Sequence, residues 1–236
     1  MLLNISNLGV SFDGLRILEG ISLNVQQGQL VSIIGANGAG KSTILRAICG
    51  LEKPQTGKIE FNGEDITGLH PKKISDLGLT MVPEGKKLFY EMTAEENLKM
   101  GAFRFRKDKA RIKRNLDRVY DLFPILREHR GRVSGTFSGG EQQMISIGRG
   151  LMCEPKLLMI DELSLGLAPL LVETLFQTIK RLNEEKVSML LVEQNINQAL
   201  KVADYGYVIE NGNLTIEGEG HALRHDERII SAYFGM

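Results

Sequence analysis

Residues 29–43, QLVSIIGANGAGKST, decide the fold of this chain. The first part is a short apolar run, which is typical of a buried strand. From Lys41 the apolar residues recur at helical spacing as far as Gly50, a glycine that is typical of a helix end. Between the two, residues 35–42 fit the pattern G-x-x-x-x-G-K-[ST]. A loop of this kind between a strand and a helix predicts a site for phosphate groups.

Each part of the loop has a predicted role in binding a nucleoside triphosphate. Small residues let several backbone N–H groups point into one concavity, and the helix N-terminus adds partial positive charge. Lys41 is predicted to reach the β- and γ-phosphates, and the Ser42 hydroxyl to bind Mg²⁺. The predicted nucleotide-binding residues of the loop are Gly35, Asn37, Gly38, Ala39, Gly40, Lys41, Ser42 and Thr43. Such loops serve kinases, GTPases, helicases and transporters, so the loop alone does not define the function.

The composition is that of a globular protein and limits the choice of partners. The chain has 236 residues, of which 42% are hydrophobic and 25% charged, and both fractions are ordinary. A formal net charge of +0 at pH 7 gives no general attraction to nucleic acid, so we expect no nucleic-acid partner. The two cysteines, Cys49 and Cys153, lack paired C-x-x-C spacing, and we expect neither a disulfide scaffold nor a zinc site.

The sequence shows no segment that would enter a membrane. The first residues, MLLNISNLGVSFDG, lack the basic start and apolar core of a signal peptide. No apolar run approaches the roughly 20 residues that span a bilayer. We therefore expect a cytoplasmic protein, which would need a membrane-embedded partner for any work at a membrane.

Strand and helix patterns alternate along the chain and predict an α/β fold with a parallel-sheet core. The expected strands are residues 2–12, 17–25, 29–35, 57–63, 78–85, 156–161 and 187–194, with a hairpin over 206–218. The expected helices are residues 41–50, 94–103, 107–123, 139–153, 168–185 and 197–205. The early strands suggest an N-terminal antiparallel β subdomain, and the helices at about 90–153 an inserted α-helical subdomain. We count residues 1–236 as one domain.

Two acids end the apolar run at residues 156–161. Because the carboxyl ends of parallel strands meet at one edge of a sheet, Asp161 is expected to face the phosphate loop and hold Mg²⁺. Glu162 follows directly and is placed to take a proton from an attacking water, a contribution of about 10²- to 10⁴-fold in rate. The same pair could cap a following helix, but the phosphate loop elsewhere in the chain favours the metal and base roles.

The segment FSGGEQQ, residues 137–143, opens a second helix with a serine, two glycines and an acid. Ser138, Gly139, Gly140 and Glu141 predict another anion-binding helix N-terminus. One chain does not need two separate grips on a γ-phosphate. Two chains related by a two-fold axis do, because each segment could close over the nucleotide held by the phosphate loop of the other chain.

With these three motifs in this order and spacing, the chain resembles the ABC ATPases, the nucleotide-binding subunits of ATP-binding-cassette transporters, over essentially its whole length. The segments MVPEGKKLF, SGGEQQM, SLGLAP and LLVEQN are similar to the branch that imports branched-chain amino acids. Close relatives in that branch handle urea or short amides, so this alternative stays open for the solute. The resemblance implies a P-loop NTPase (RecA-like) core that hydrolyses ATP with Mg²⁺.

The resemblance also implies partners and a location. The partners are transmembrane permease subunits, a second ABC ATPase subunit that is either identical or merely similar, and, indirectly, a solute-binding protein. The location is cytoplasmic and peripheral, on the inner face of the cell membrane. The helical subdomain and the region from Glu84 to Phe89 are expected to dock the permease.

The resemblance assigns roles to three further residues. Phe12 matches the aromatic residue that stacks on adenine, although a core residue on an edge strand is the other interpretation. Glu84 stands where most of the superfamily has a glutamine that senses the γ-phosphate and Mg²⁺, and is expected to contact Mg²⁺ through water or to act in coupling. Gln194 stands where most members have a histidine that contacts the γ-phosphate. Because the glutamine side chain carries no charge, Gln194 can only donate or accept hydrogen bonds there.

Two features of the sequence admit a second interpretation. The basic run at residues 104–114, RFRKDKARIKR, could approach anionic lipid, but a solvated helix face is the more common explanation. The departures at Glu84 and Gln194 also motivate a non-transport ABC ATPase, a nucleotide-driven switch with negligible hydrolysis. DNA-repair relatives carry long coiled coils or zinc modules, for which 236 residues leave no room.

Overall fold

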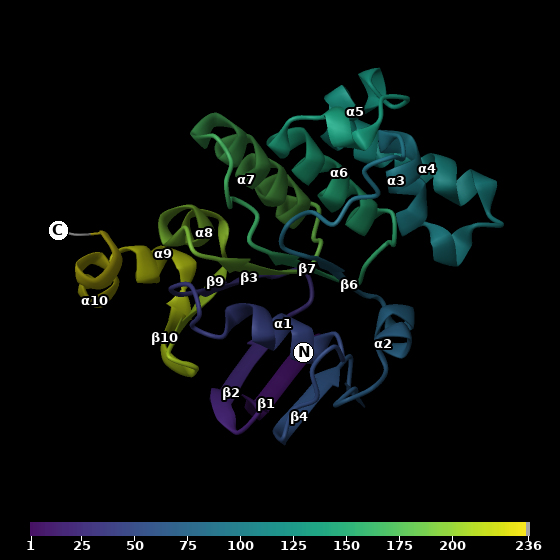
Figure 1. Ribbon diagram of the computed structural model, residues 1–236. Helices are drawn as coiled ribbons and strands as arrows, with labels where there is room; N and C mark the ends of the chain where they lie inside the picture. Colours follow the sequence, from purple (N-terminus) through teal and green to yellow (C-terminus); the bar gives the residue numbers. More distant parts are fainter. Residues whose placement is uncertain (235–236) are drawn as a thin grey trace.

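In the computed structural model, which describes residues 1–234, two β-sheets are stacked with helix α1 between them (Figure 1). The larger sheet has the strand order β10-β9-β3-β8-β7-β6. Its strands are β3 (Leu30–Ile34), β6 (Leu79–Val82), β7 (Leu157–Asp161), β8 (Met189–Glu193), β9 (Tyr205–Glu210) and β10 (Asn213–Glu219). All neighbouring strands are parallel except β10, which returns antiparallel to β9 as the outer arm of a hairpin.

The smaller sheet is formed by early strands in the order β2-β1-β4-β5, all antiparallel. Its strands are β1 (Leu3–Phe12), β2 (Leu15–Val25), β4 (Thr56–Phe61) and β5 (Glu64–Asp65). The predicted N-terminal antiparallel β subdomain is therefore confirmed. In Figure 1 this sheet lies below α1, on the opposite side of that helix from the larger sheet.

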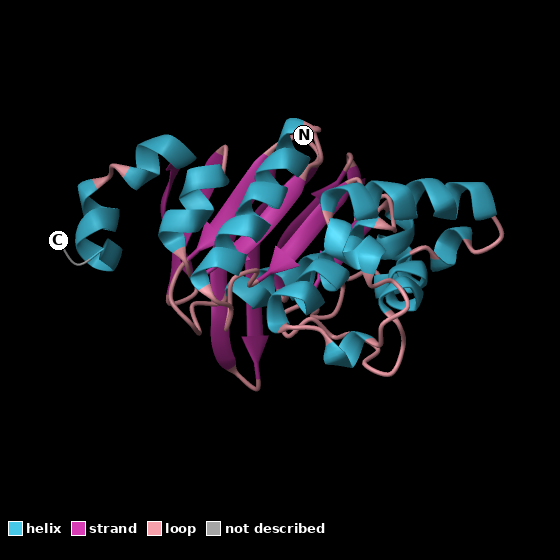
Figure 2. Ribbon diagram, turned by 90° about the horizontal axis from the view of Figure 1, so that it is seen from above, coloured by secondary structure: helices cyan, strands magenta, loops and turns pink. Residues whose placement is uncertain are grey.

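The helices divide into those that cover the larger sheet and those that project beyond it. The helices are α1 (Lys41–Ile48), α2 (Pro71–Leu77), α3 (Ala94–Gly101), α4 (Lys109–Leu122), α5 (Pro124–Glu128), α6 (Gly139–Leu151), α7 (Pro169–Glu184), α8 (Ile196–Val202), α9 (Gly220–Arg224) and α10 (Glu227–Ile229). Short 3₁₀ turns lie at Phe103–Phe105 and Ser134–Thr136, and a π-helical turn at Ile230–Phe234. Figures 1 and 2 show α3, α4 and α5 at one end of the molecule, beyond the strands.

Burial on both faces explains the apolar character of the central strands. Every residue of β3, β7 and β8 is buried. Because side chains alternate along a strand, Val31 and Ile33 pack with α1 and the smaller sheet, whereas Leu158 and Ile160 pack with the layer of α6 and α7. The polar and charged ends of these strands are thereby left at one edge of the sheet, where loops can present them.

The predicted fold class, a parallel-sheet α/β core with an inserted helical region, is confirmed, and two predicted element ends are three residues too late. The strand expected at residues 78–85 ends at Val82. The helix expected at residues 197–205 ends at Val202, and Tyr205 already pairs with Val31 in the sheet. Asp204 causes this early end: its carboxylate accepts a hydrogen bond from Leu30 N (2.8 Å) and its own N–H donates to Leu30 O (2.9 Å). The short helices α2, α5, α9 and α10 were not expected. The domain expected at residues 1–236 includes residues 235–236, which lie outside the described part of the chain.

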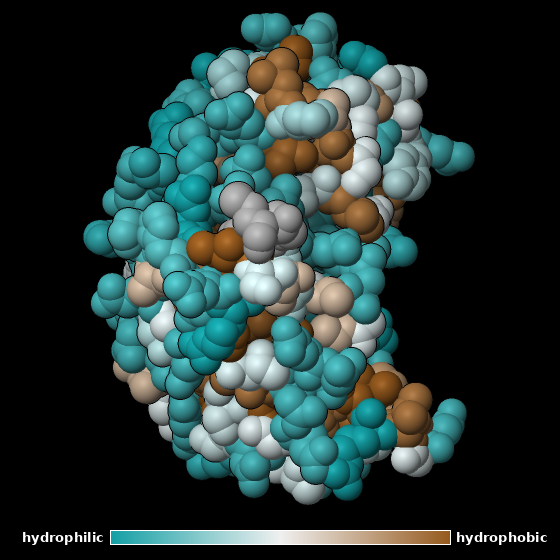
Figure 3. Space-filling view, turned by 90° about the vertical axis from the view of Figure 1, so that its left-hand side faces the viewer, coloured by the Kyte–Doolittle hydropathy of each residue, from teal (hydrophilic) through white to brown (hydrophobic). Residues whose placement is uncertain are grey.

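Polar side chains cover most of the face shown in Figure 3, with apolar patches toward its upper and lower ends. Several large apolar side chains lie on the surface, among them Phe103 and Leu170, which are 60% and 75% exposed. No helix within residues 1–234 combines the length and the apolar character needed to cross a bilayer. The exposed apolar groups therefore belong to a surface that is otherwise polar.

Candidate nucleotide-binding site

The sheet topology brings the predicted motifs to one edge. β8 lies between β3 and β7, and all three strands run parallel, so their carboxyl ends lie side by side. The phosphate loop follows β3, Asp161 and Glu162 lie at the end of β7, and Gln194 follows β8. The edge of a parallel sheet is where ligands bind in open α/β folds.

Two glycines show that the phosphate loop is held against its surroundings. A Cβ atom on Gly35 would lie 2.2 Å from the carbonyl oxygen of Ile209, in β9. Gly40, the N-cap of α1, has φ 102°, and a Cβ atom there would lie 2.6 Å from Leu18 Cδ2. Any other residue at either position would clash or be strained. The loop is thus fixed between β2 and the β9–β10 hairpin.

Lys41 holds its ammonium group at the floor of this loop. The residue is 4% exposed, and Nζ donates hydrogen bonds to the carbonyl oxygens of Gly35 and Ala36, each at 2.9 Å. The Glu162 carboxylate lies 3.8 Å from the same nitrogen. A phosphate group entering the loop would therefore meet a buried cation that is already in position.

Ser42 and Asp161 form a pair of oxygen ligands suitable for Mg²⁺. Ser42 Oγ donates to Asp161 Oδ1 at 2.9 Å. Burial, together with nearby Glu84 and Glu162, raises the pKa of Asp161 to about 6, although the Ser42 hydrogen bond opposes this shift. Within residues 1–234 no group of three or more His, Cys, Asp or Glu side chains is placed to hold a metal by itself. The pair fits Mg²⁺, which is usually held by one or two carboxylates with phosphate oxygens and water.

Glu162 occupies a strained backbone position beside Lys41. Its φ of 51° lies in the left-handed region, which costs a non-glycine residue on the order of 1–3 kcal/mol. The backbone N–H donates to Val192 O at 3.0 Å, which holds the residue against the end of β8. The side chain is only 10% exposed and faces the loop. The Glu162 carboxylate therefore lies beside the Lys41 ammonium group at the edge of the phosphate loop.

A hollow of about 300 Å³ brings eight of the predicted site residues together. It is lined by Ile17, Asn37, Gly38, Gly40, Lys41, Ser42, Thr43, Glu84, Glu162 and Leu165. Ile17 and Leu165 were not predicted, because isolated apolar residues in loops or strands give no sequence signal. Phe12 is not part of this lining: it lies at the end of β1 and is 39% exposed.

The end of β8 and the segment after it lie beside the phosphate loop, and β8 ends in a buried acid that was not predicted. Gln194 lines a second hollow of about 360 Å³ together with Gly35 and Ala36. The preceding residue, Glu193, is 1% exposed, and burial raises its pKa. Its carboxylate accepts hydrogen bonds from Ser164 N (2.9 Å) and Ser164 Oγ (2.8 Å), which joins the loops after β7 and β8. The sequence signal that could have identified Glu193 is an acid at the end of an apolar strand.

Residues 137–143, the signature segment, lead into α6 and form a separate site. Ser138 is the N-cap: its N–H donates to Glu141 Oε2 at 2.7 Å, and Glu141 N donates to Ser138 Oγ at 3.4 Å. The Glu141 carboxylate is thus occupied in a capping box. Ser138 and Gly139 are exposed, whereas Gly140 is buried beneath Leu171. None of residues 138–141 lines the hollow of the phosphate loop.

Comparison with known proteins agrees with this architecture. The family model described as ABC transporter matches residues 18–164. The chain is 44% identical over 234 residues to the high-affinity branched-chain amino acid transport ATP-binding protein BraG of Pseudomonas aeruginosa, covering 99% of this chain and 100% of BraG. It is 34% identical to the probable branched-chain amino acid transport ATP-binding protein LivF of Archaeoglobus fulgidus, covering 97% of each.

Solved structures show the same fold over the full length. The crystal structure of a nucleotide-free ATP-binding cassette from an ABC transporter superposes with a TM-score of 0.86 at 27% identity, covering 100% of this chain and 99% of that one. The fold, the family model and the full-length relatives together confirm the resemblance seen in the sequence. The chain belongs to the ABC transporter family, whose ATP-binding subunits hydrolyse ATP to drive transport.

Proposed function

We propose that the chain powers the import of branched-chain amino acids by hydrolysing ATP. The observation that supports this solute class most directly is the similarity to BraG, which extends over the whole of both chains. The proposal places the chain on the cytoplasmic face of the cell membrane, bound to permease subunits that receive their solute from a solute-binding protein.

In the proposed site the phosphate loop binds the triphosphate through its backbone N–H groups, and Lys41 provides the cation. Ser42 and Asp161 would hold Mg²⁺, which supplies charge neutralisation to the phosphates when bound. Glu84, which lines the same hollow, would reach the metal through water. Phe12, exposed at the end of β1, would stack on the adenine once the nucleotide extends from the loop.

Glu162 would act as the general base. Its carboxylate accepts a proton as the oxygen of a water attacks the γ-phosphorus, and the bond from that phosphorus to the oxygen shared with the β-phosphate breaks. The products are ADP and phosphate. Gln194 would orient the γ-phosphate or the water by hydrogen bonds alone, because its amide carries no charge.

The proposed working unit is a dimer in which each chain completes the site of the other. Ser138 and Gly139 lie outside the hollow of their own phosphate loop and are exposed at a helix N-terminus, and Gly140 follows them beneath Leu171. In a two-fold pair they would cap the γ-phosphate held by the partner copy. Hydrolysis removes that contact, so the pair would close with ATP and reopen after phosphate release.

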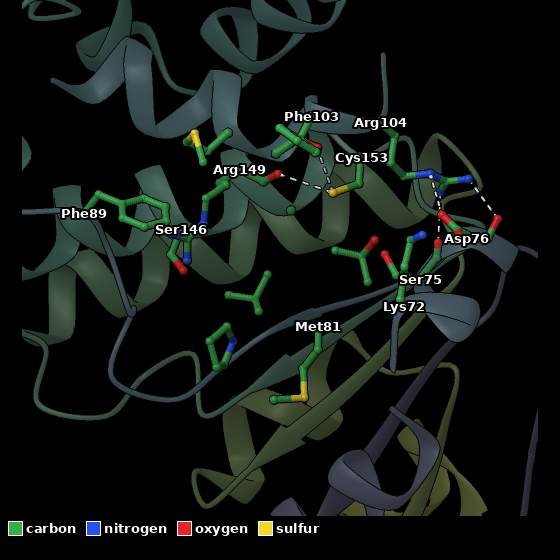
Figure 4. Close-up of a pocket in the computed structure, with 16 residues that line it drawn as sticks. Lys72, Ser75, Asp76, Met81, Phe89, Phe103, Arg104, Ser146, Arg149 and Cys153 are labelled. Carbon is green, nitrogen blue, oxygen red and sulfur yellow. Dashed lines mark hydrogen bonds and ion pairs between the residues drawn. The ribbon is translucent and has the colours of Figure 1, made fainter. Parts of the chain in front are cut away.

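A groove between the core and the helical subdomain is the proposed permease dock. It has a volume of about 610 Å³ and lies between α2, β6, the loop after β6, α3 and α6 (Figure 4). Phe89 and Phe103 line it and are 45% and 60% exposed. Arg104 closes one end by donating to the carbonyl oxygens of Ser75 (2.9 Å) and Asp76 (2.8 Å).

The chemistry of the groove suits a short amphipathic helix from the permease. Its lining is largely apolar with a few charged groups at the rim, which is the usual pattern of a groove that accepts a helix. The loop that forms one wall contains Glu84, which lines the nucleotide hollow. Movement of the docked helix would therefore act on the nucleotide site through this loop.

Uptake measured in cells tests the proposed solute. Deleting the gene is expected to abolish ATP-dependent uptake of leucine, isoleucine and valine, and the wild-type gene to restore it, whereas Lys41→Met should not. Normal leucine uptake combined with lost uptake of urea or acetamide would replace the proposed solute by the alternative one. Phosphate release by the purified protein distinguishes either import function from a nucleotide-driven switch. ATP-dependent dimerisation without ATP turnover would favour the non-transport role.

A further inference from the structure

The tip of the signature helix carries a cation that none of the roles above uses. A Cβ atom placed on Gly139 would lie 3.5 Å from Lys86 Nζ. Lys86 belongs to the loop after Glu84, far from α6 in the sequence, and its side chain is partly buried. Among residues 1–234 no carboxylate lies within ion-pairing distance of its ammonium group.

This placement is electrostatically unfavourable for an isolated chain. The N-terminus of a helix carries partial positive charge, so a cation beside the first turn of α6 is repelled by it. Glu141, the nearest acid in the sequence, is turned back to the Ser138 N–H in the capping box. The lysine, the exposed Gly139 and the Ser138 hydroxyl thus lie together at a helix N-terminus with no anion to balance their charge.

The backbone of Lys86 is held by α6, so its side chain starts from a defined position beside that helix. Lys86 and Lys87 have φ of 64° and 46°, which are left-handed values rare outside glycine. Lys86 O accepts hydrogen bonds from Ser146 Oγ (2.9 Å) and Arg149 (3.0 Å), and Lys87 O accepts one from Arg149 (2.8 Å). Figure 4 shows Ser146 and Arg149 beside Phe89 in the groove wall.

We propose that Lys86 binds the γ-phosphate of the nucleotide held by the partner copy, as a cationic member of the signature site. This inference rests on the dimeric site of the proposed function. Each nucleotide would then face two cations, Lys41 of its own chain and Lys86 of the other. The second cation would supply charge at the γ-phosphate that the neutral Gln194 does not. Arg149 and Ser146 act as positioning residues for Lys86.

Dimerisation of a hydrolysis-impaired protein tests the proposal. In the Glu162→Gln background, light scattering would record the ATP concentration that gives half-maximal dimer, with and without Lys86→Met. We expect Lys86→Met to raise that concentration at least about tenfold, because a charge-assisted contact is lost from each site. Lys86→Arg should restore most of the effect. ATP binding to the monomer, followed with a fluorescent analogue, should not change.

Lys87→Met is the matched control. It removes the same charge one residue later, and its amine lies near Gly85 rather than Gly139. We expect it to dimerise as the Glu162→Gln parent does. If Lys86→Met and Lys87→Met both dimerise like the parent, Lys86 has no role at the signature site, while the proposed function stands. If the parent with Lys86 intact stays monomeric in ATP, the dimeric closure itself is wrong, and this inference falls with it.

Discussion

The two helix N-termini in this chain that are suited to phosphate differ in how far the chain completes them. α1 begins at Lys41 after a glycine cap without a side-chain hydrogen bond, inside a hollow lined by the loop, Glu84 and Glu162. α6 begins at Gly139 with a complete capping box and an exposed tip. The first is partly enclosed and contains its own cation and the proposed metal ligands, whereas the second has a complete cap without a ligand and is open to solvent. This difference is what the proposed dimer requires, in which the first binds nucleotide alone and the second acts on nucleotide held by another copy.

Replacing the proposed base should have the largest effect on the enclosed site. Glu162→Gln is expected to lower ATP turnover by about 10²- to 10⁴-fold, because the amide cannot accept a proton from water. ATP affinity should change little. Steady-state phosphate release and equilibrium nucleotide binding measure the two quantities. Glu173→Gln, at an exposed position on α7, is the control and should turn over ATP normally. Turnover of Glu162→Gln near that of the wild type would remove Glu162 from the chemistry.

The buried cation should matter for binding. Lys41→Met is expected to weaken ATP binding by about 10- to 100-fold, because a charged hydrogen-bond donor to the phosphates is lost. Titration with a fluorescent ATP analogue measures this change. Lys53→Met, at an exposed position after α1, should bind ATP normally. Equal affinity of the two variants would contradict the assignment of Lys41.

Substitution of Ser138, the N-cap of α6, should affect more than the stability that an ordinary helix cap provides. Ser138→Ala is expected to lower the free energy of unfolding by about 1 kcal/mol through loss of the cap, and also to lower ATP turnover. Thr93→Ala breaks the equivalent capping box at α3, which lies away from the nucleotide hollow. It should cost similar stability and leave turnover unchanged. Parallel losses of turnover in both variants would show that stability alone explains the effect of Ser138.

A smaller effect is expected at the far end of α6, where Glu154 joins the helix to α4. Hydrogen bonds, first from Arg111 and then from Asn115, lower the pKa of Glu154 to about 2 from an ordinary value of 4.5. A lowered pKa stabilises the folded state above pH 4.5, and this contribution is lost as the pH falls toward 2. The pair is about one-third exposed, so Glu154→Gln should cost less than about 1 kcal/mol at pH 7.

Chemical denaturation of both proteins across this pH range measures the contribution of Glu154. The stability difference between wild type and Glu154→Gln should shrink as the pH falls from 4.5 toward 2. A difference that is constant over that range would show that the carboxylate charge contributes nothing.

The enclosed site was predictable from sequence because its parts are local. Residues 35–43 carry their strand, loop and helix together, and Asp161 and Glu162 end a run too apolar to be anything but a buried strand. The parallel topology then brings the two segments together. The fold followed from the same alternation of strands and helices.

The open site and its surroundings were only partly predictable, because their geometry depends on contacts between distant segments. The backbone position of Lys86 depends on left-handed φ values that no lysine signals in a sequence, and on a hydrogen bond that its carbonyl oxygen accepts from Arg149. The proposed permease groove arises between α2, β6, the loop after β6, α3, the 3₁₀ turn at Phe103–Phe105 and α6, none of which is unusual alone. The early end of α8 depends on Asp204 reaching Leu30, 174 residues away.

Complementation between two inactive variants tests most directly whether the two sites complete each other across chains. Lys41→Met disables the phosphate loop and Ser138→Arg blocks the signature tip, so each protein alone should hydrolyse almost no ATP. In a mixed dimer one site combines the intact loop of one chain with the intact tip of the other. An equimolar mixture should therefore recover roughly a quarter of wild-type turnover if pairing is random and the sites are independent. A mixture no more active than the two variants measured separately would contradict the account.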